Sequence, residues 1–200
     1  MGSFIKNVLC LTLITVVAGF GLGYVYDITK GPIAQMEENT KLNAFRTVFP
    51  EAESFSDTGV AETSENILSA AGITGVDIDS AVTANDASGN KIGYVINSTT
   101  HDGYGGDITL SIGIDNEGVV KGIEILSISE TAGLGMKAKE AKFKDQFKDK
   151  KVKQFSYTKT GAVQEFEIDA LSGATITTKA VTNAVNGALA YYDSIGGTAQ

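Results

Sequence analysis

Residues 107–129 read "DITLSIGIDNEGVVKGIEILSIS", and their pattern predicts the centre of a β-sheet. In the first half every second residue is isoleucine or leucine, which is the alternation of a strand with one buried face. The Asp-Asn-Glu-Gly sequence at 115–118 indicates a hairpin turn, and the returning segment again alternates isoleucines. We therefore expect two neighbouring antiparallel strands on either side of this turn.

Two further strands are predicted from weaker patterns. The segment "KIGYVINS" at 91–98 places alternate apolar residues on one face. The segment "AVQEFEID" at 162–169 predicts a last strand. Its apolar positions are Val163, Phe166 and Ile168. Residues 51–90 are acidic, rich in Ser, Thr and Ala, and weakly patterned, so a short helix and loops are expected there.

Helices are predicted at the flanks of these strands. Residues 137–149 form an expected Lys-rich helix that buries Phe143 and Phe147 as an i, i+4 pair. The wider segment 137–153 has eight lysines and three acidic residues, and either docks an acidic partner or anionic lipid or forms a solvated face. A helix at 177–192 has the buried stripe Ala180, Val181, Ala184, Val185, Ala188 and Leu189. The predicted class is α+β, with a largely antiparallel sheet flanked by helices.

Residues 8–26, "VLCLTLITVVAGFGLGYVY", contain no charged side chain and predict a transmembrane helix. At 1.5 Å per residue the segment spans about 28 Å, close to the hydrocarbon thickness of a bilayer. Lys6 precedes it and Asp27 follows it, so the positive-inside rule places the N-terminus in the cytoplasm. We expect a single-pass protein of the cell membrane, with a cytoplasmic N-terminus at 1–7, the membrane helix at 8–26, a juxtamembrane stalk helix at 27–50 and an extracytoplasmic domain at 51–200.

This N-terminal segment leaves alternatives open. A cleaved signal peptide is also apolar, although the run is long for one and lacks a clean small-residue cleavage site. Gly19 and Gly23 are spaced to pack against another membrane helix, or are ordinary membrane glycines. Gly31-Pro32 is expected to break the chain outside the membrane, with Pro32 in the first turn of the stalk helix.

The composition excludes several kinds of site. The chain has 42% hydrophobic residues, enough for a core, and a net charge of −8 that argues against nucleic-acid binding. Cys10 is the one cysteine and His101 the one histidine. We therefore expect no multi-cysteine cluster, no His-rich metal site and no catalytic triad, so both a metal site and catalytic side chains are predicted to be absent. This scarcity favours a bound cofactor as the source of any redox chemistry.

The stretch "DALSGATITTKAV" at 169–181 leads into the last predicted helix. A helix N-terminus offers backbone N–H groups and the positive end of a dipole, and both stabilise a phosphate. Gly173 and Ala174 leave room for a large group, and Thr175 presents a hydroxyl just ahead of the helix. Plain N-capping by one of the hydroxyls is the alternative.

Two glycine-rich segments are weaker signals. "HDGYGGDI" at 101–108 and "SETAGLGMK" at 129–137 either contact a ligand or are ordinary loops. In the second segment Leu134 would flank an aromatic ligand, and Thr131 would offer a hydroxyl. His101 is either a neighbour of such a ligand or an exposed loop histidine.

The N-terminal apolar segment, "GYGGDI", "ETAGLG" and "DALSGATITT" occur together and in this order. In this combination the chain resembles the G subunit of the Rnf electron-transport complex, which has an FMN-binding domain. It is also similar to the C subunit of the sodium-translocating NADH:quinone oxidoreductase. The resemblance covers nearly the whole chain and is best between residues 91 and 190. One departure is Ala132, which stands where the family usually has proline.

The resemblance implies that FMN is joined through its phosphate to Thr175 as a phosphoester. A separate flavin transferase would install the group from FAD. The implied recognition positions for that enzyme are Asp169, Ser172, Gly173 and Ala174. The implied positions next to the isoalloxazine are Glu130, Thr131, Leu134 and Gly135.

We therefore expect a membrane-anchored electron-transfer subunit with one covalent FMN, in an ion-translocating ferredoxin:NAD oxidoreductase complex. Its partners would be the other subunits of this complex, and it would have no independent turnover. The nearest alternative is the C subunit of the NADH:quinone oxidoreductase or another extracytoplasmic flavin carrier. The alternative of another class is a cofactor-free, membrane-anchored binding or sensor domain.

Overall fold

The computed structural model describes residues 2–59 and 64–196. The chain divides into two compact units, Met1–Thr40 and Lys41–Gln200, and each is described by itself. The predicted segments also include residue 1, residues 60–63 and residues 197–200, which lie outside the described residues.

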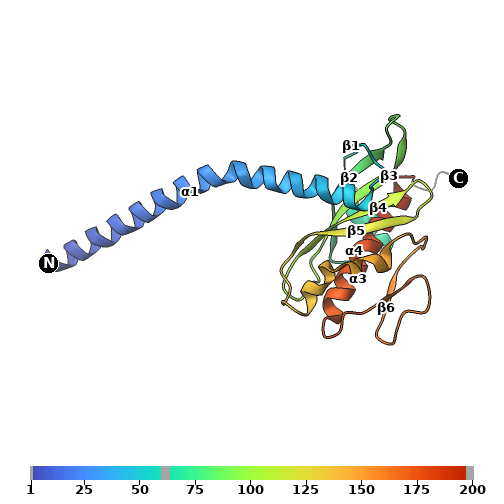
Figure 1. The fold of residues 1–200 in the computed structure, drawn as a ribbon. Helices are drawn as coiled ribbons and strands as arrows, with labels where there is room; N and C mark the ends of the chain where they lie inside the picture. Colours follow the sequence, from blue (N-terminus) through green and yellow to red (C-terminus); the bar gives the residue numbers. More distant parts are fainter. Residues whose placement is uncertain (1, 60–63, 197–200) are drawn as a thin grey trace. The chain divides into compact units, whose positions relative to one another are not determined.

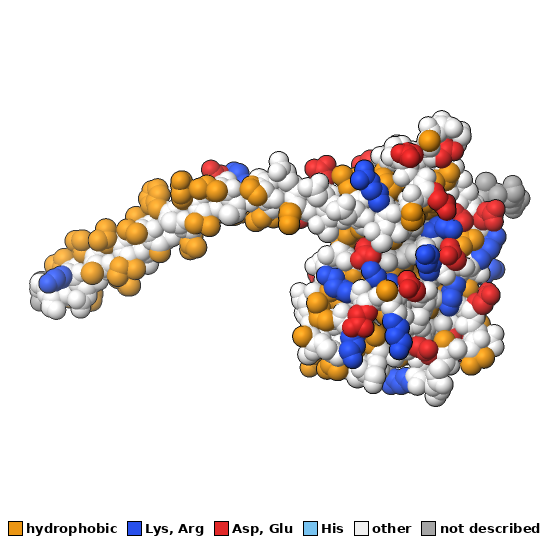
Figure 2. All heavy atoms as spheres, in the orientation of Figure 1, with side chains coloured by type: hydrophobic (Ala, Val, Ile, Leu, Met, Phe, Trp, Pro, Cys, Tyr) orange, Lys and Arg blue, Asp and Glu red, His pale blue; other side chains and the backbone are white. Residues whose placement is uncertain are grey.

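The first unit is helical over all of its described residues. Helix α1 (Gly2–Val48) continues through it into the second unit and contains a stretch long and apolar enough to cross a membrane. Figure 2 shows the apolar side chains exposed along this helix. The break expected at Gly31-Pro32 is wrong, because Pro32 lies inside α1. Proline cannot donate to the carbonyl four residues earlier, but that residue, Ile28, is 56% exposed, so its carbonyl can be hydrated instead.

The second unit is built on an antiparallel sheet with the strand order β1-β2-β3-β4-β5, shown in Figure 1. The strands are β1 (Ser54–Asp57), β2 (Val76–Asn85), β3 (Lys91–Thr100), β4 (Ile108–Asp115) and β5 (Val120–Ile128). β4 and β5 pair around the turn at 115–118, which confirms the predicted hairpin. β3 pairs with β4 and confirms the strand predicted at 91–98.

Residues 51–90 contain more regular structure than expected. The short helix α2 (Ser64–Ala70) agrees with the prediction, but β1 and β2 lie where loops were expected. β2 was missed because its register shifts between Ile78 and Ser80, which interrupts the two-residue alternation. Beyond this irregularity its buried positions are Ala81 and Ala84, which are too small to give a strong apolar signal.

Helix α4 (Thr175–Ser194) lies against one face of the sheet and forms the main core with it (Figure 1). The fully buried strand residues that it covers include Ile96, Ile108, Leu110, Ile112 and Ile114. From the helix, the predicted stripe is confirmed in full, with Ala180, Val181, Ala184, Val185, Ala188 and Leu189 all buried. The start of α4 is therefore held by a long, well-packed helix.

The last turns of α1 belong to the second unit and cover part of the opposite sheet face. Phe45 and Val48 of α1, together with Phe49 directly after it, are at most 6% exposed and form a second core cluster with Ala84 and Val95. Val95 and the next residue of β3, Ile96, point to opposite sides of the sheet, as in any strand. This sheet therefore has both faces partly covered.

The Lys-rich segment does not form the continuous helix expected at 137–149. It consists of the short elements η1 (Gly135–Lys139), α3 (Ala141–Lys144) and η2 (Asp145–Phe147). Glu140 adopts an extended conformation, with ψ 142°, and separates the first two elements. Phe143 and Phe147 are buried as predicted and pack edge to face, with ring centroids 5.7 Å apart. Figure 2 shows acidic and basic side chains interspersed on the surface of this unit.

A second sheet contains the parallel strands β6 (Ser156–Thr158) and β7 (Glu167–Asp169). The strand predicted over 162–169 is therefore correct only at its end. Ile168 is buried as expected, whereas Val163 is 85% exposed and Phe166 is 43% exposed. These two residues lie on the connection between the strands, so their apolar character does not reflect strand pairing.

Candidate functional site

Three segments that are distant in the sequence line one cavity of about 610 Å³. They are the 101–107 loop, the loop between β5 and η1, and the start of α4. The predicted site residues on its walls are Glu130, Thr131, Leu134, Gly135, Gly173, Ala174 and Thr175. The volume lies within the range of small-molecule and cofactor sites. The fold thus brings together the three motifs that the sequence singles out.

Thr175 is the first residue of α4, and Ala174 is the N-cap residue. Among the described residues no side chain caps this end of the helix, so the plain N-capping alternative is wrong. The first backbone N–H groups of α4 are therefore available to an anion. In the described part of the chain the Thr175 hydroxyl also has no hydrogen-bond partner, and Thr175 is partly exposed on the cavity wall.

The neighbouring hydroxyls have different environments. Thr178 Oγ1 accepts a backbone N–H of the preceding turn and donates to the carbonyl of Ala174, each at 3.0 Å, which fixes that turn. Thr177 lines the cavity but is only 1% exposed, and Ser172 is exposed outside the cavity. Thr175 is therefore the accessible hydroxyl of this stretch on the cavity wall.

Glu130 joins the two loops of the cavity. Its side chain is buried, and Oε1 accepts the backbone N–H of Tyr104 at 2.7 Å and that of Gly105 at 3.3 Å. The loops pack closely, because a Cβ on Gly105 would collide with the carbonyl oxygen of Ser129. A carboxylate that accepts two N–H groups makes strong, charge-assisted hydrogen bonds. Glu130 therefore has a structural role as a clasp, in addition to its predicted place beside a cofactor.

Residues 131–134 form a tight turn at the cavity wall. The Leu134 N–H donates to the Thr131 carbonyl at 3.1 Å, and Gly133 has φ 77°. Ala132 has no positive φ, so the turn is of type II, with Ala132 at the second position and glycine at the third. Proline is favoured at the second position of such a turn. This gives a physical reason why the family usually has proline where this chain has Ala132.

Two glycines keep the cavity open. A Cβ on Gly135 would lie 2.6 Å from both Glu130 Oε2 and Thr177 Oγ1, well inside contact distance. A Cβ on Gly173 would lie 3.1 Å from Leu134, and Gly173 also has φ 74°. Larger residues at these positions would occupy the space between the loops and α4.

Asp169 and Ser172 are the predicted site residues that do not line the cavity. Asp169 Oδ1 accepts the backbone N–H of Ala162 at 2.5 Å, and its own N–H donates to Gln146 Oε1 at 2.6 Å. Glu167 accepts two further N–H groups of the β6–β7 connection, and these hydrogen bonds lower the pKa of its carboxyl. Asp169 thus fastens that connection to the segment leading into α4.

Three cavity residues were not predicted as site residues: Tyr104, Ile176 and Thr177. Tyr104 is 71% exposed and Ile176 is 52% exposed, so both present apolar surface at the cavity. Ile176 could have been identified in the sequence, because it is apolar and lies outside the buried stripe of its helix. Tyr104 gives no such signal, since its placement depends on the fold of the loop.

Residues 103–190 match the family described as the FMN-binding domain, a range that includes all nine predicted site residues. The chain is 33% identical to the G subunit of the Na(+)-translocating ferredoxin:NAD(+) oxidoreductase complex of Acetobacterium woodii, over 94% of this chain and 90% of that protein. It is 32% identical to the G subunit of the proton-translocating ferredoxin:NAD(+) oxidoreductase complex of Clostridium ljungdahlii, over 90% and 86%.

A solved structure shares the fold. It is the C subunit of the Na(+)-translocating NADH-quinone reductase from Parabacteroides distasonis, with a TM-score of 0.53 and 22% identity. The similarity covers 74% of this chain and 79% of that chain. The predicted α+β class is confirmed, with an apolar N-terminal helix followed by an antiparallel sheet and helices.

Proposed function

This chain belongs to the family of G subunits of ion-translocating oxidoreductase complexes, and we propose that its FMN is joined covalently to Thr175. The chain is a membrane-anchored redox subunit of such a complex, anchored once through α1. By analogy with its relatives, the complex transfers electrons between ferredoxin and NAD and couples this transfer to ion transport. Turnover belongs to the complex, and the subunit relays electrons between its neighbours.

The cavity fits FMN in size and in the character of its walls. Tyr104, Leu134 and Ile176 supply exposed apolar surface for a flat aromatic ring. Gly135 and Gly173 leave space that a Cβ would fill. FMN supplies the redox chemistry when bound, and the protein's own residues provide its position and the polarity around it.

The start of α4 carries the proposal for covalent attachment. The Thr175 hydroxyl lies on the cavity wall at a helix N-terminus that no described side chain caps. A phosphodiester at Thr175 retains one negative charge, which the N–H groups and dipole of this 20-residue helix would stabilise. Of all the features of the chain, this accessible hydroxyl at an uncapped helix end beside the cavity supports the proposal most directly.

The attachment reaction balances with FAD as the donor. The Thr175 oxygen would attack the phosphorus of the FMN half, and the pyrophosphate bond to the AMP half would break. The products are the threonine phosphodiester, AMP and the hydroxyl proton. A flavin transferase would catalyse this step, and we propose that it recognises Asp169 and Ser172 together with Gly173 and Ala174.

The proposed topology explains why a covalent bond is useful. The one charged side chain before the apolar segment, Lys6, favours a cytoplasmic N-terminus and an extracytoplasmic domain. A dissociable cofactor would be lost where its free concentration is low. A covalent link keeps the local concentration of the flavin constant.

Flavin attachment is tested by co-expressing the full chain with a flavin transferase. Denatured protein is expected to show in-gel flavin fluorescence and a mass increase of one FMN unit, and Thr175→Ala should abolish both. Thr160→Ala, which removes an exposed hydroxyl that does not line the cavity, should retain both signals. Fluorescence that survives Thr175→Ala would refute the acceptor assignment. Absence of flavin in the parent chain would favour a cofactor-free sensor.

A further inference from the structure

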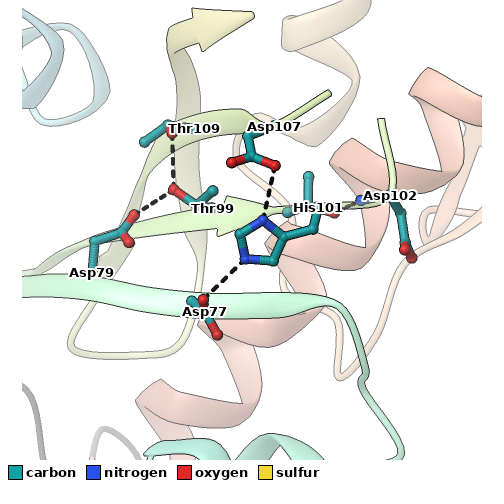
Figure 3. Close-up of polar contacts among 8 residues, drawn as sticks. Asp77, Asp79, Thr99, His101, Asp102, Asp107 and Thr109 are labelled. Carbon is teal, nitrogen blue, oxygen red and sulfur yellow. Dashed lines mark hydrogen bonds and ion pairs between the residues drawn. The ribbon is translucent and has the colours of Figure 1, made fainter. Parts of the chain in front are cut away.

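His101 is the first residue of the glycine-rich loop at 101–107. Its side chain lies between two acidic side chains, as Figure 3 shows. Its Nε2 lies 3.0 Å from Asp77 Oδ2, and its Nδ1 lies 2.9 Å from Asp107 Oδ1. Its backbone N–H also donates to the Gly75 carbonyl at 2.9 Å. The histidine therefore ties the loop at 101–107 both to β2 and to its own far end.

The same loop is fixed on its other side by Glu130. The N–H groups of Tyr104 and Gly105 donate to one carboxylate oxygen of that residue. The loop is thus held at its ends by the His101 side chain and in its middle by the Glu130 carboxylate. Tyr104, which lies between these contacts, is on the cavity wall. Because glycines make up much of this loop, its own backbone preferences impose little order.

The charges around His101 favour its protonated form. Hydrogen bonds to Asp77 and Asp107 raise the pKa of His101 to about 9. Asp79 on β2 also faces this group, and burial raises the pKa of its carboxyl, against a hydrogen bond from Thr99. The charge of Lys41, near the end of α1, acts in the opposite direction to burial and lowers the pKa of Asp79. A neutral imidazole could donate to only one of its two carboxylate partners, whereas the imidazolium donates to both.

We propose that His101 is a positioning residue for the cofactor: its imidazolium, bridging Asp77 and Asp107, latches the loop that places Tyr104 at the cavity. This role rests on the proposed function of the cavity but not on the covalent bond at Thr175. His101 does not line the cavity, so it acts through the loop and not on the flavin itself. It is an exposed loop histidine, as one of the two interpretations of the sequence expected, yet both ring nitrogens are engaged.

The latch can be observed without flavin, because the chain contains no tryptophan. Tyr104→Trp in the full Thr175→Ala chain places a single indole on the loop, and Tyr104 is exposed enough to accept the larger ring. The anisotropy of this indole and its quenching by acrylamide are then measured in detergent between pH 6.5 and 10. We expect the indole to become more mobile and more easily quenched in one step with a midpoint near pH 9.

Substitutions in this probe chain distinguish the titration of His101 from the titration of other groups. His101→Gln should remove the step and give high mobility at every pH. Asp77→Asn should shift the midpoint to lower pH, because one of the two carboxylate partners of the imidazolium loses its charge. Lys121→Gln breaks a different surface ion pair, to Asp149, and should leave the step unchanged. A step that persists in His101→Gln, or a midpoint that Asp77→Asn does not move, would overturn the proposal.

A second measurement uses the flavin-loaded chain with its native Tyr104. His101→Gln should leave the yield of attached flavin unchanged, because Thr175 lies on α4 and not on the loop. The anisotropy of flavin fluorescence should fall, because a loosened loop restricts the ring less. Unchanged anisotropy in the loaded His101→Gln chain contradicts the positioning role. Flavin that stays attached in the Thr175→Ala control would refute only the covalent bond at Thr175, so the two proposals fail separately.

Discussion

Replacing Ala132 with proline is expected to stabilise the second unit. Ala132 occupies the second position of a type II turn, a position that requires a negative φ near the value fixed by proline, and its φ is not positive. Within the described chain its N–H donates to no acceptor, so the substitution removes no hydrogen bond. Proline at a compatible position contributes about 0.4–1 kcal/mol by restricting the unfolded chain. For a chain of this length that is a rise in Tm of about 1–4 °C.

The assay is thermal unfolding of the full chain in detergent, followed by circular dichroism. Gly133→Ala is the matched control at the next position, because its φ of 77° is costly for a residue with a Cβ. It should destabilise by about 1–2 kcal/mol. A lower Tm for Ala132→Pro would show that the turn is not of type II.

Three further substitutions test contacts around the cavity. Gly135→Ala places a Cβ 2.6 Å from Glu130 and Thr177, so urea unfolding should show a free energy of unfolding lower by about 1–3 kcal/mol. An unchanged midpoint would mean that these two side chains move aside at no cost. His101 is half-exposed, so His101→Gln should cost only about 1 kcal/mol in the same assay. Because its folded pKa is raised from 6.5 to about 9, this contribution is complete below pH 6.5 and lost as pH rises to about 9; a difference that persists at pH 10 would contradict this. Asp169→Asn should speed proteolytic cleavage of the β6–β7 connection, and equal cleavage rates would show that its hydrogen bond does not order that loop.

Periodic segments were the predictable part of the fold. Strand β4 and the inner stripe of α4 combine strict periodicity with large or tightly packed apolar residues, so their faces were assigned correctly. β2 was missed because a register shift and small buried side chains weaken its pattern. The connection at 159–166 imitates a strand in sequence, since Val163 and Phe166 are apolar yet exposed.

The candidate site was predictable as three motifs but not as a geometry. Seven of the nine predicted residues line one cavity, whereas Asp169 acts on a loop outside it. The clasp made by Glu130 depends on a contact with Tyr104, 26 residues away in the sequence, which only the fold brings together. Local sequence patterns report local conformation, so such long-range hydrogen bonds remain outside their reach.

Helix α4 has a mechanical consequence for whatever is joined to its first residue. Its inner stripe lies wholly within the core, so Thr175 is the first residue of a helix that is packed along its length. A flavin linked there through a phosphate and a flexible sugar-alcohol chain would have a fixed point of attachment and a flexible linker to its ring. With the flavin attached as proposed, the helix would fix the point of attachment, and the two glycine loops would set the orientation of the ring. Substitutions in the loops would then reorient the ring towards a different electron partner without moving its point of attachment.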